Sequence, residues 1–204
     1  MGRHFSMIRD FQPADFLTLA NGACGTAAIF LAIEHARAAS AGRIYGATAL
    51  VVAALVFDVL DGRVARWRHD ASPLGRELDS LADVISFGVA PACLAYAVGL
   101  DAVLDVLALL VFVACGISRL ARYNVTADAL AAPSGKVTHF EGTPIPTSTL
   151  LVALLALLTW LERIGPALPF GVLRLGPLGL HPLVLLFVLS GSLMISKTLR
   201  IPKP

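Results

Sequence analysis

The chain has 204 residues, of which 57% are hydrophobic and 15% are charged, and its formal net charge is +2. So large an apolar fraction excludes a disordered chain. So few charges also exclude an ordinary water-soluble domain of this size, in which about 25% of residues are charged. The composition therefore indicates an integral membrane protein, and we expect a single domain over residues 1–204 with no nucleic-acid partner.

Six apolar stretches are long enough, or nearly so, to cross the membrane as helices: residues 16–36, 44–60, 80–100, 102–121, 144–161 and 178–196. A helix needs about 20 apolar residues to cross the hydrocarbon core. We therefore predict an all-α, polytopic membrane protein with six transmembrane helices. The short interval 99–102 predicts a tight hairpin, and the Gly- and Pro-rich stretch 165–179 predicts an irregular connection.

Lysine and arginine residues are distributed unevenly between the predicted loops. If the N-terminus is cytoplasmic, twelve of the sixteen lie on the cytoplasmic side, and four lie on the opposite side: Arg37, Arg43, Arg163 and Arg174. Cytoplasmic loops carry the excess of Lys and Arg in membrane proteins. We therefore predict that both termini, and the loops at 62–78 and 122–143, are cytoplasmic.

Two pairs of aspartates flank the first of these loops. Asp58 and Asp61 are three residues apart, and Asp79 and Asp83 are four apart, so each pair occupies one helical face. Four carboxylates that converged there would repel one another and lose hydration. Mg²⁺ or Mn²⁺ prefers oxygen ligands and would relieve both costs. Two such cations could clamp a diphosphate and stabilise its leaving group, so we predict a site for two divalent cations.

Small and basic residues follow the first pair. Gly62 and Ala65 leave a groove in which a flat base or ribose could lie, and Arg66 could meet a phosphate. Two alternatives stay open: the acids could pair with loop arginines, and the small residues could serve a helix–helix contact.

Residues 58–83 read DVLDGRVARWRHDASPLGRELDSLAD and match the pattern D-x2-D-G-x2-A-R-x8-G-x3-D-x3-D at every fixed position. This segment resembles the CDP-alcohol phosphatidyltransferase family. The resemblance implies a six-helix membrane fold, a homodimer, and a two-metal reaction in which an alcohol displaces CMP from a CDP-linked lipid. It further implies metal ligands at Asp58, Asp61, Asp79 and Asp83, with Asp83 also the general base, and CDP-lipid contacts at Gly62, Ala65, Arg66 and Gly75.

Four further segments resemble the phosphatidylserine synthases of bacteria and archaea, a group within that family: residues 16–25, 77–92, 115–125 and 139–149. The first makes Thr18 and Asn21 candidate contacts to the nucleotide. Asp15 stands where an Asn is expected, so we leave it out of the site. The resemblance implies CDP-diacylglycerol and L-serine as substrates, membrane lipids as surroundings, and a site at the cytoplasmic face of the inner membrane.

Serine carries a carboxylate that a basic side chain could bind. Arg119 and Arg122, three residues apart, and Lys136 are the candidates. Alternatively these residues anchor the protein at the membrane surface or contact lipid headgroups. Other acceptors, glycerol 3-phosphate or inositol 1-phosphate, also stay open. So does a small cation-dependent transporter, although transporter sites usually lie near the midplane of the membrane.

Overall fold

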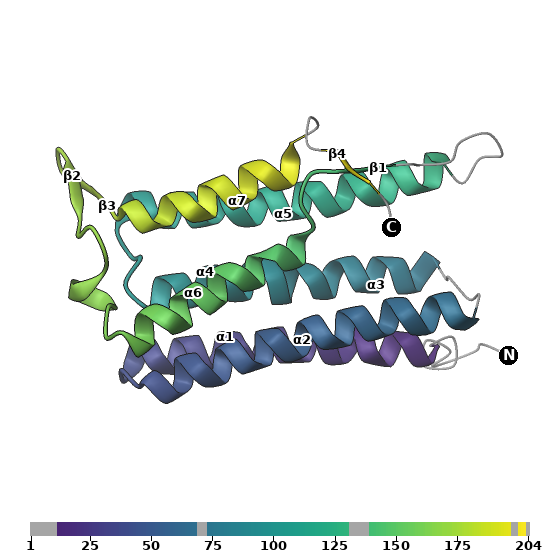
Figure 1. The fold of residues 1–204 in the computed structure, drawn as a ribbon, viewed down its shortest axis with the longest axis horizontal. Coiled ribbons are helices and arrows are strands. Elements are labelled where there is room, and N and C mark those ends of the chain that lie inside the picture. The colour runs from purple at the N-terminus through teal and green to yellow at the C-terminus, as the bar shows by residue number, and fades with distance from the viewer. Residues whose placement is uncertain (1–11, 69–72, 131–138, 197–199, 203–204) are drawn as a thin grey trace, which may run out of the picture.

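The computed structural model describes residues 12–68, 73–130, 139–196 and 200–202. The described chain is a bundle of six helical rods (Figure 1). The third rod is composite, because α3 passes through a π-helical segment, Val84–Val89, into α4, and single turns of 3₁₀ helix, Ile145–Ser148 and Pro182–Val184, precede the last two. The α-helices are α1 Pro13–Arg37, α2 Ala41–Arg68, α3 Pro73–Asp83, α4 Ala90–Ala97, α5 Val103–Leu130, α6 Thr149–Trp160 and α7 Leu185–Ile195.

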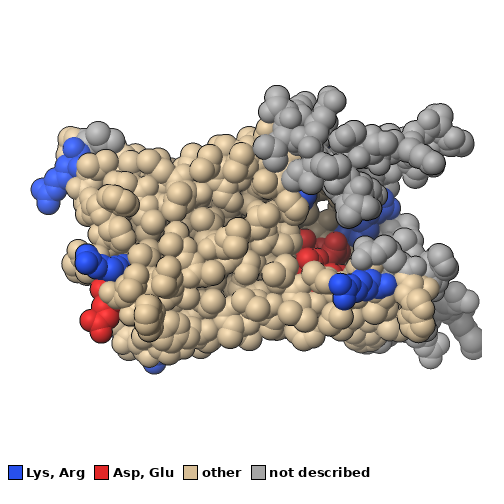
Figure 2. Space-filling model, viewed as in Figure 1, with Lys and Arg blue, Asp and Glu red and all other residues tan. Residues whose placement is uncertain are grey.

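Four helical segments are long and apolar enough to cross a membrane: Pro13–Arg37, Ala41–Val64, Leu74–Ala97 and Val103–Val125. The other two rods, Ile145–Trp160 and Pro182–Ile195, are shorter. On the face shown in Figure 2, charged side chains gather at the two ends of the bundle and leave a broad uncharged belt between them. The prediction of an all-α membrane protein is therefore confirmed, whereas six crossings remain a prediction.

The helix ends differ from those predicted. The bounds predicted for the loops at 62–78 and 122–143 are wrong, because α2 continues to Arg68, α3 begins at Pro73 and α5 continues to Leu130. The hydropathy of the sequence indicates which residues lie within the bilayer, but it does not show where a helix ends, because a helix can extend beyond the bilayer. Arginine, which is abundant in 62–68, is a good helix former, so the charged segment continues the helix.

The predicted hairpin at 99–102 is present, and Gly99 has the positive φ of 116° that glycine adopts readily. The irregular connection predicted at 165–179 is partly wrong. It contains a 3₁₀ turn, Gly165–Ala167, and the strand β2, Leu173–Leu175, which pairs antiparallel with β3, Leu178–Leu180. At the other end of the molecule β1, His139–Glu141, pairs antiparallel with β4, Arg200–Pro202.

Buried residues form one stripe on α1 and one on α2, spaced alternately by three and four residues. This is the spacing of a single helical face. The α1 stripe consists of Ala14, Thr18, Asn21, Gly25, Ala28 and Ala32, and the α2 stripe of Ile44, Ala47, Val51, Ala54 and Asp61, with Asp58 half-buried in the same register. Small residues let the two helices approach closely. Both stripes become polar at the same end of the bundle.

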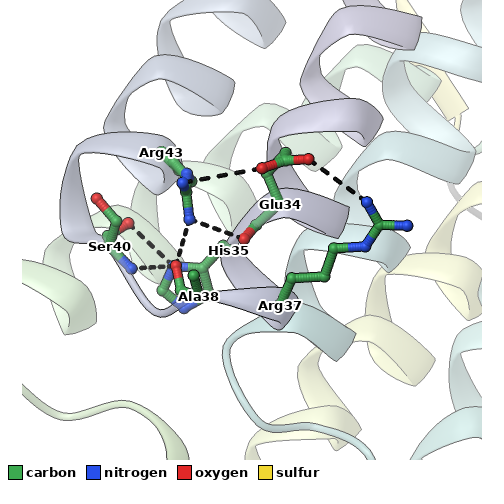
Figure 3. Close-up of polar contacts among 6 residues, drawn as sticks. All are labelled: Glu34, His35, Arg37, Ala38, Ser40 and Arg43. Carbon is green, nitrogen blue, oxygen red and sulfur yellow. Dashed lines mark hydrogen bonds and ion pairs between the residues drawn. The ribbon is translucent and has the colours of Figure 1, made fainter.

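The turn between α1 and α2 lies at the opposite end and is shown in Figure 3. Arg43 donates hydrogen bonds to the backbone oxygens of Glu34, at 2.9 Å, and of Ala38. The Glu34 carboxylate pairs with Arg43 at 3.8 Å and with Arg37 at 3.6 Å. Two arginines assigned by sequence to this side therefore compensate the negative C-terminus of α1.

A buried carboxylate on α5 hydrogen-bonds to the segment that precedes α7. Asp105 is fully buried and accepts hydrogen bonds from the backbone N–H of Ala102, at 3.1 Å, and of His181, at 2.8 Å. Its Oδ2 atom also lies 2.5 Å from Nδ1 of His181. This pair joins elements that are far apart in sequence at the end of the bundle that carries the β2–β3 hairpin (Figure 1).

We expect Asp105→Ala to lower the melting temperature by about 10 °C, measured by thermal unfolding in detergent. Removing one partner of a buried pair costs about 3–5 kcal/mol, and each kcal/mol shifts the melting temperature by about 2–4 °C at this chain length. Asp101→Ala is the control, because Asp101 is exposed on the same turn. Equal melting temperatures for the two variants would show that the pair contributes nothing to stability.

Candidate active site

Three aspartates come together where α2 ends and α3 begins. Asp58 and Asp61 of α2 and Asp79 of α3 each offer a carboxylate oxygen, and these atoms all lie within 4.8 Å of one another. Asp61 is 6% exposed, and the other two are half-buried. The spacing of three and four residues in the sequence predicted this convergence, and the antiparallel course of α2 and α3 brings it about (Figure 1).

Asp83 lies one helical turn deeper along the third rod. It is 5% exposed and is not one of the three residues whose oxygens lie within 4.8 Å of one another. Asp83 nevertheless lines the same small cavity as Asp79. Asp83 therefore adjoins the cluster from the interior of the bundle, and its role as a fourth ligand or as a base remains a prediction.

Helix α1 supplies one hydrogen-bond donor to each of two aspartates. The Thr18 hydroxyl donates to Oδ2 of Asp61 at 2.7 Å, and Nδ2 of Asn21 donates to Oδ1 of Asp83 at 3.1 Å. Both donors are buried. Thr18 and Asn21 therefore hold the carboxylates in place, and the direct contact to a nucleotide that the sequence suggested for them remains a prediction.

The donor set of the cluster suits a hard divalent cation. Every potential ligand is a carboxylate oxygen, as Mg²⁺ and Mn²⁺ prefer. Oδ1 of Asp79 is buried and has no hydrogen-bond partner among the described residues. Burying an uncompensated carboxylate is costly, so the three aspartates could hold a divalent cation.

A small cavity of about 160 Å³ opens beside the cluster, between α3 and α5. Asp79 and Asp83 line one wall, and Arg119 and Asn124 of α5 line the other. The Nε atom of Arg119 is buried without a hydrogen-bond partner in the described part of the chain. The Arg119 guanidinium, with this unpaired donor, therefore lines the same cavity as Asp79 and Asp83.

The other predicted basic residues do not share this cavity. Arg122 lines a separate space of about 470 Å³ between α5 and α7, where it donates to the backbone oxygen of Ile195 at 3.4 Å. Lys136 lies outside the described residues, as do the side chains of Ala65 and Arg66. Gly62, in the last part of α2, and Gly75, in the first turn of α3, are both half-buried.

Sequence reasoning missed a polar link between the two walls of the cavity. Nδ2 of Asn124 donates to Oγ of Ser80 at 3.0 Å and to Oε1 of Glu77 at 3.3 Å. A single Asn in a helix gives no signal of such a partner, since the contact spans more than forty residues. Asp15, which was left out of the site, is buried and accepts a hydrogen bond from the backbone of Gln12 at 2.8 Å, at the start of α1.

The model of the CDP-alcohol phosphatidyltransferase family matches residues 11–190. The chain belongs to this family. It is 44% identical over 204 residues to the CDP-diacylglycerol–serine O-phosphatidyltransferase of Saccharomyces cerevisiae, which covers 98% of this chain and 74% of the yeast protein. The predicted family membership is therefore confirmed by a match that extends well beyond the residues 58–83 motif.

Two prokaryotic relatives are similar over a shorter region. The archaetidylserine synthase of Methanothermobacter thermautotrophicus is 38% identical over 142 residues, or 68% of this chain and 55% of that protein. The CDP-diacylglycerol–serine O-phosphatidyltransferase of Bacillus subtilis is 33% identical over 142 residues, or 69% of this chain and 72% of that protein.

We expect Thr18→Val to weaken Mn²⁺ binding about 10-fold, because loss of a hydrogen bond to a metal ligand typically costs 10- to 100-fold in affinity. Electron paramagnetic resonance of Mn²⁺ titrated into purified protein measures this directly. Thr26→Val is the matched control, since the Thr26 hydroxyl donates at 2.9 Å to Gly22 within α1. Equal Mn²⁺ affinities for both variants would contradict a role of Thr18 in holding Asp61.

Proposed function

We propose that this protein transfers a phosphatidyl group from CDP-diacylglycerol to L-serine, with release of CMP and formation of phosphatidylserine. One observation carries the proposal: a cluster of carboxylates adjoins a small cavity lined by Arg119, whose buried Nε atom has no hydrogen-bond partner among the described residues. The names of the yeast and Bacillus relatives state the same activity for those proteins.

The CDP-lipid would place its acyl chains in the bilayer and its CDP group at the end of α2. Gly62, Ala65, Arg66 and Gly75 would line the nucleotide, as the family motif implies. Asp58, Asp61, Asp79 and Asp83 would hold two divalent cations, Mg²⁺ or Mn²⁺. Bound cations would neutralise the charge that develops on the departing CMP.

L-serine would occupy the cavity between α3 and α5. The planar guanidinium of Arg119 suits bidentate binding of a carboxylate. A volume of about 160 Å³ is some five times the share of one water molecule in the liquid, which suits a small amino acid. A phosphorylated alcohol such as glycerol 3-phosphate is larger and dianionic, and it would meet Asp79 and Asp83 across the same cavity.

Asp83 would act as the general base. A serine hydroxyl is a weak nucleophile at neutral pH, so a base within reach must accept its proton. As the proton moves to Asp83, the serine oxygen forms a bond to the lipid-side phosphorus, and the bond from that phosphorus to the CMP oxygen breaks. The hydrogen bond from Asn21 fixes one oxygen of Asp83 and leaves the other for this transfer.

We also propose that the site and both termini face the cytoplasm and that the protein is a homodimer in the inner membrane. The excess of Lys and Arg in the segments on the site's side supports the orientation. α1 begins, α2 ends and α3 begins at that end (Figure 1). Family membership supports the homodimer.

The deciding assay offers labelled L-serine, glycerol 3-phosphate and inositol 1-phosphate in parallel to the purified protein, with CDP-diacylglycerol and Mn²⁺ or Mg²⁺. We expect label to enter lipid from serine alone. Asp83→Asn should abolish turnover and largely spare CDP-lipid binding. Transfer of label from another acceptor would refute the choice of serine. If no acceptor were used by folded, metal-bound protein, the proposed activity would be refuted and the transporter alternative favoured.

Arg119→Gln should raise the KM for serine about 10- to 100-fold, because a hydrogen bond to a charged group is worth about 1.5–3 kcal/mol. The KM for CDP-diacylglycerol should change little. Arg122→Gln is the matched control, since Arg122 lies three residues along α5 and lines a different space. If the serine KM rose in Arg122→Gln and stayed constant in Arg119→Gln, the assignment would be reversed.

A further inference from the structure

The segment that follows Asp83 departs from ordinary helical geometry. Residues Val84–Val89 form a π-helix between α3 and α4. Such segments are rare and occur frequently at functional sites. Ser86 and Phe87 within it are fully buried, so its conformation depends on the neighbours that pack against it.

The first neighbour is α1, and the contact passes through Asn21. The Ser86 hydroxyl donates to the backbone oxygen of Asn21 at 2.9 Å. The side chain of the same Asn21 donates to Asp83 at 3.1 Å. Asp83 and Ser86 are three residues apart on the third rod. Both therefore hydrogen-bond to the same residue of α1, Asn21.

Gly25 allows this contact to form. It lies one turn beyond Asn21 on the same buried face of α1. A Cβ atom at Gly25 would lie 2.4 Å from Oγ and 2.6 Å from Cα of Ser86. Neither distance is tolerable, and the Ser86 backbone cannot swing away as a flexible side chain can. At Gly22, by contrast, an added Cβ would make an ordinary contact of 3.5 Å with Ala82.

A second neighbour holds the π-helix from another direction. Ser148, fully buried in the 3₁₀ turn before α6, donates its hydroxyl to the backbone oxygen of Phe87 at 2.6 Å. The segment is therefore hydrogen-bonded on one side to α1 and on another to the turn Ile145–Ser148. Each bond links elements more than sixty residues apart in sequence.

We propose that Ser86 and Gly25 are positioning residues for Asp83: their contact holds the π-helix against α1, so that Asn21 fixes the Asp83 carboxylate beside the acidic cluster. The inference rests on the proposed function only in giving Asp83 a role at the metal site. Functional groups need placement within about 0.5 Å, and a misplacement of 1 Å can cost about 100-fold in rate.

The test compares Ser86→Ala, Gly25→Ala and the matched control Gly191→Ala. Gly191 lies on α7, where an added Cβ would meet Phe112 and Cys115 of α5 at 3.3 Å, away from the acidic cluster. Mn²⁺ affinity, kcat, both KM values and the melting temperature are measured for each. We expect Ser86→Ala to lower kcat and Mn²⁺ affinity about 10-fold each, with both KM values within twofold of the wild type, and Gly25→Ala to lower kcat and Mn²⁺ affinity further.

Ser86→Ala decides the outcome if Gly25→Ala fails to fold, because it removes a single hydroxyl and adds no atom. Wild-type kcat and Mn²⁺ affinity in Ser86→Ala would overturn the inference, as would an equal loss of both in Gly191→Ala, which would indicate a general effect of helix packing. If the wild type transferred nothing to serine, the proposed function would fail, yet the Mn²⁺ affinities of the three variants would still decide whether Ser86 and Gly25 position the site.

Discussion

Mutual repulsion among Asp58, Asp61 and Asp79 is the constraint around which the rest of the structure is organised. If all three are ionised, charges no more than 4.8 Å apart repel by at least about 3 kcal/mol per pair at an effective dielectric constant of 20. Three such pairs approach the whole folding stability of a typical domain, about 5–15 kcal/mol. The Thr18 hydroxyl offsets a part of this, but it is one neutral donor. A divalent cation held by the three carboxylates would relieve this repulsion.

The fold meets this constraint with the same helical face that builds its core. On α1, Ala28 and Ala32 pack in the core of the bundle, and the same buried face continues toward the N-terminus with Gly25, Asn21 and Thr18. The stripe on α2 likewise changes from Val51 and Ala54 to Asp58 and Asp61. Because packing and site share one register, a rotation of either helix would displace the core and the carboxylates together. The geometry of the site is thereby stabilised by the apolar contacts of the bundle.

The parts of this arrangement that sequence could predict are those set by local geometry. The i, i+3 and i, i+4 spacing places the two aspartates of each pair on the same face of their helix. Because the two helices are consecutive and antiparallel (Figure 1), these faces can readily pack against each other. Helix ends were misplaced because hydropathy reports the bilayer. Arg119 and Arg122 are three residues apart, so the same spacing rule places them on one face of α5. Three residues do not complete a full helical turn, however, and the two side chains line different cavities. The π-helix and the Asn124–Ser80 bond depend on partners distant in sequence, for which VISFGV and RYNV give no periodic signal.

The shortness of the last two rods has a consequence for the surrounding bilayer. With a rise of about 1.5 Å per α-helical residue and about 2.0 Å per 3₁₀ residue, Ile145–Trp160 and Pro182–Ile195 extend for about 26 Å and about 22 Å, against about 30 Å of hydrocarbon. Figure 1 shows α6 and α7 stopping short of the end at which α2 and α3 meet. If these rods cross the membrane as predicted, a hydrophobic mismatch arises beside α6 and beside α7, and local thinning of the bilayer is one way to accommodate it. With such thinning, the phosphates of lipids beside α6 and α7 lie deeper, nearer to the level of the acidic cluster, than those of lipids beside the longer α1.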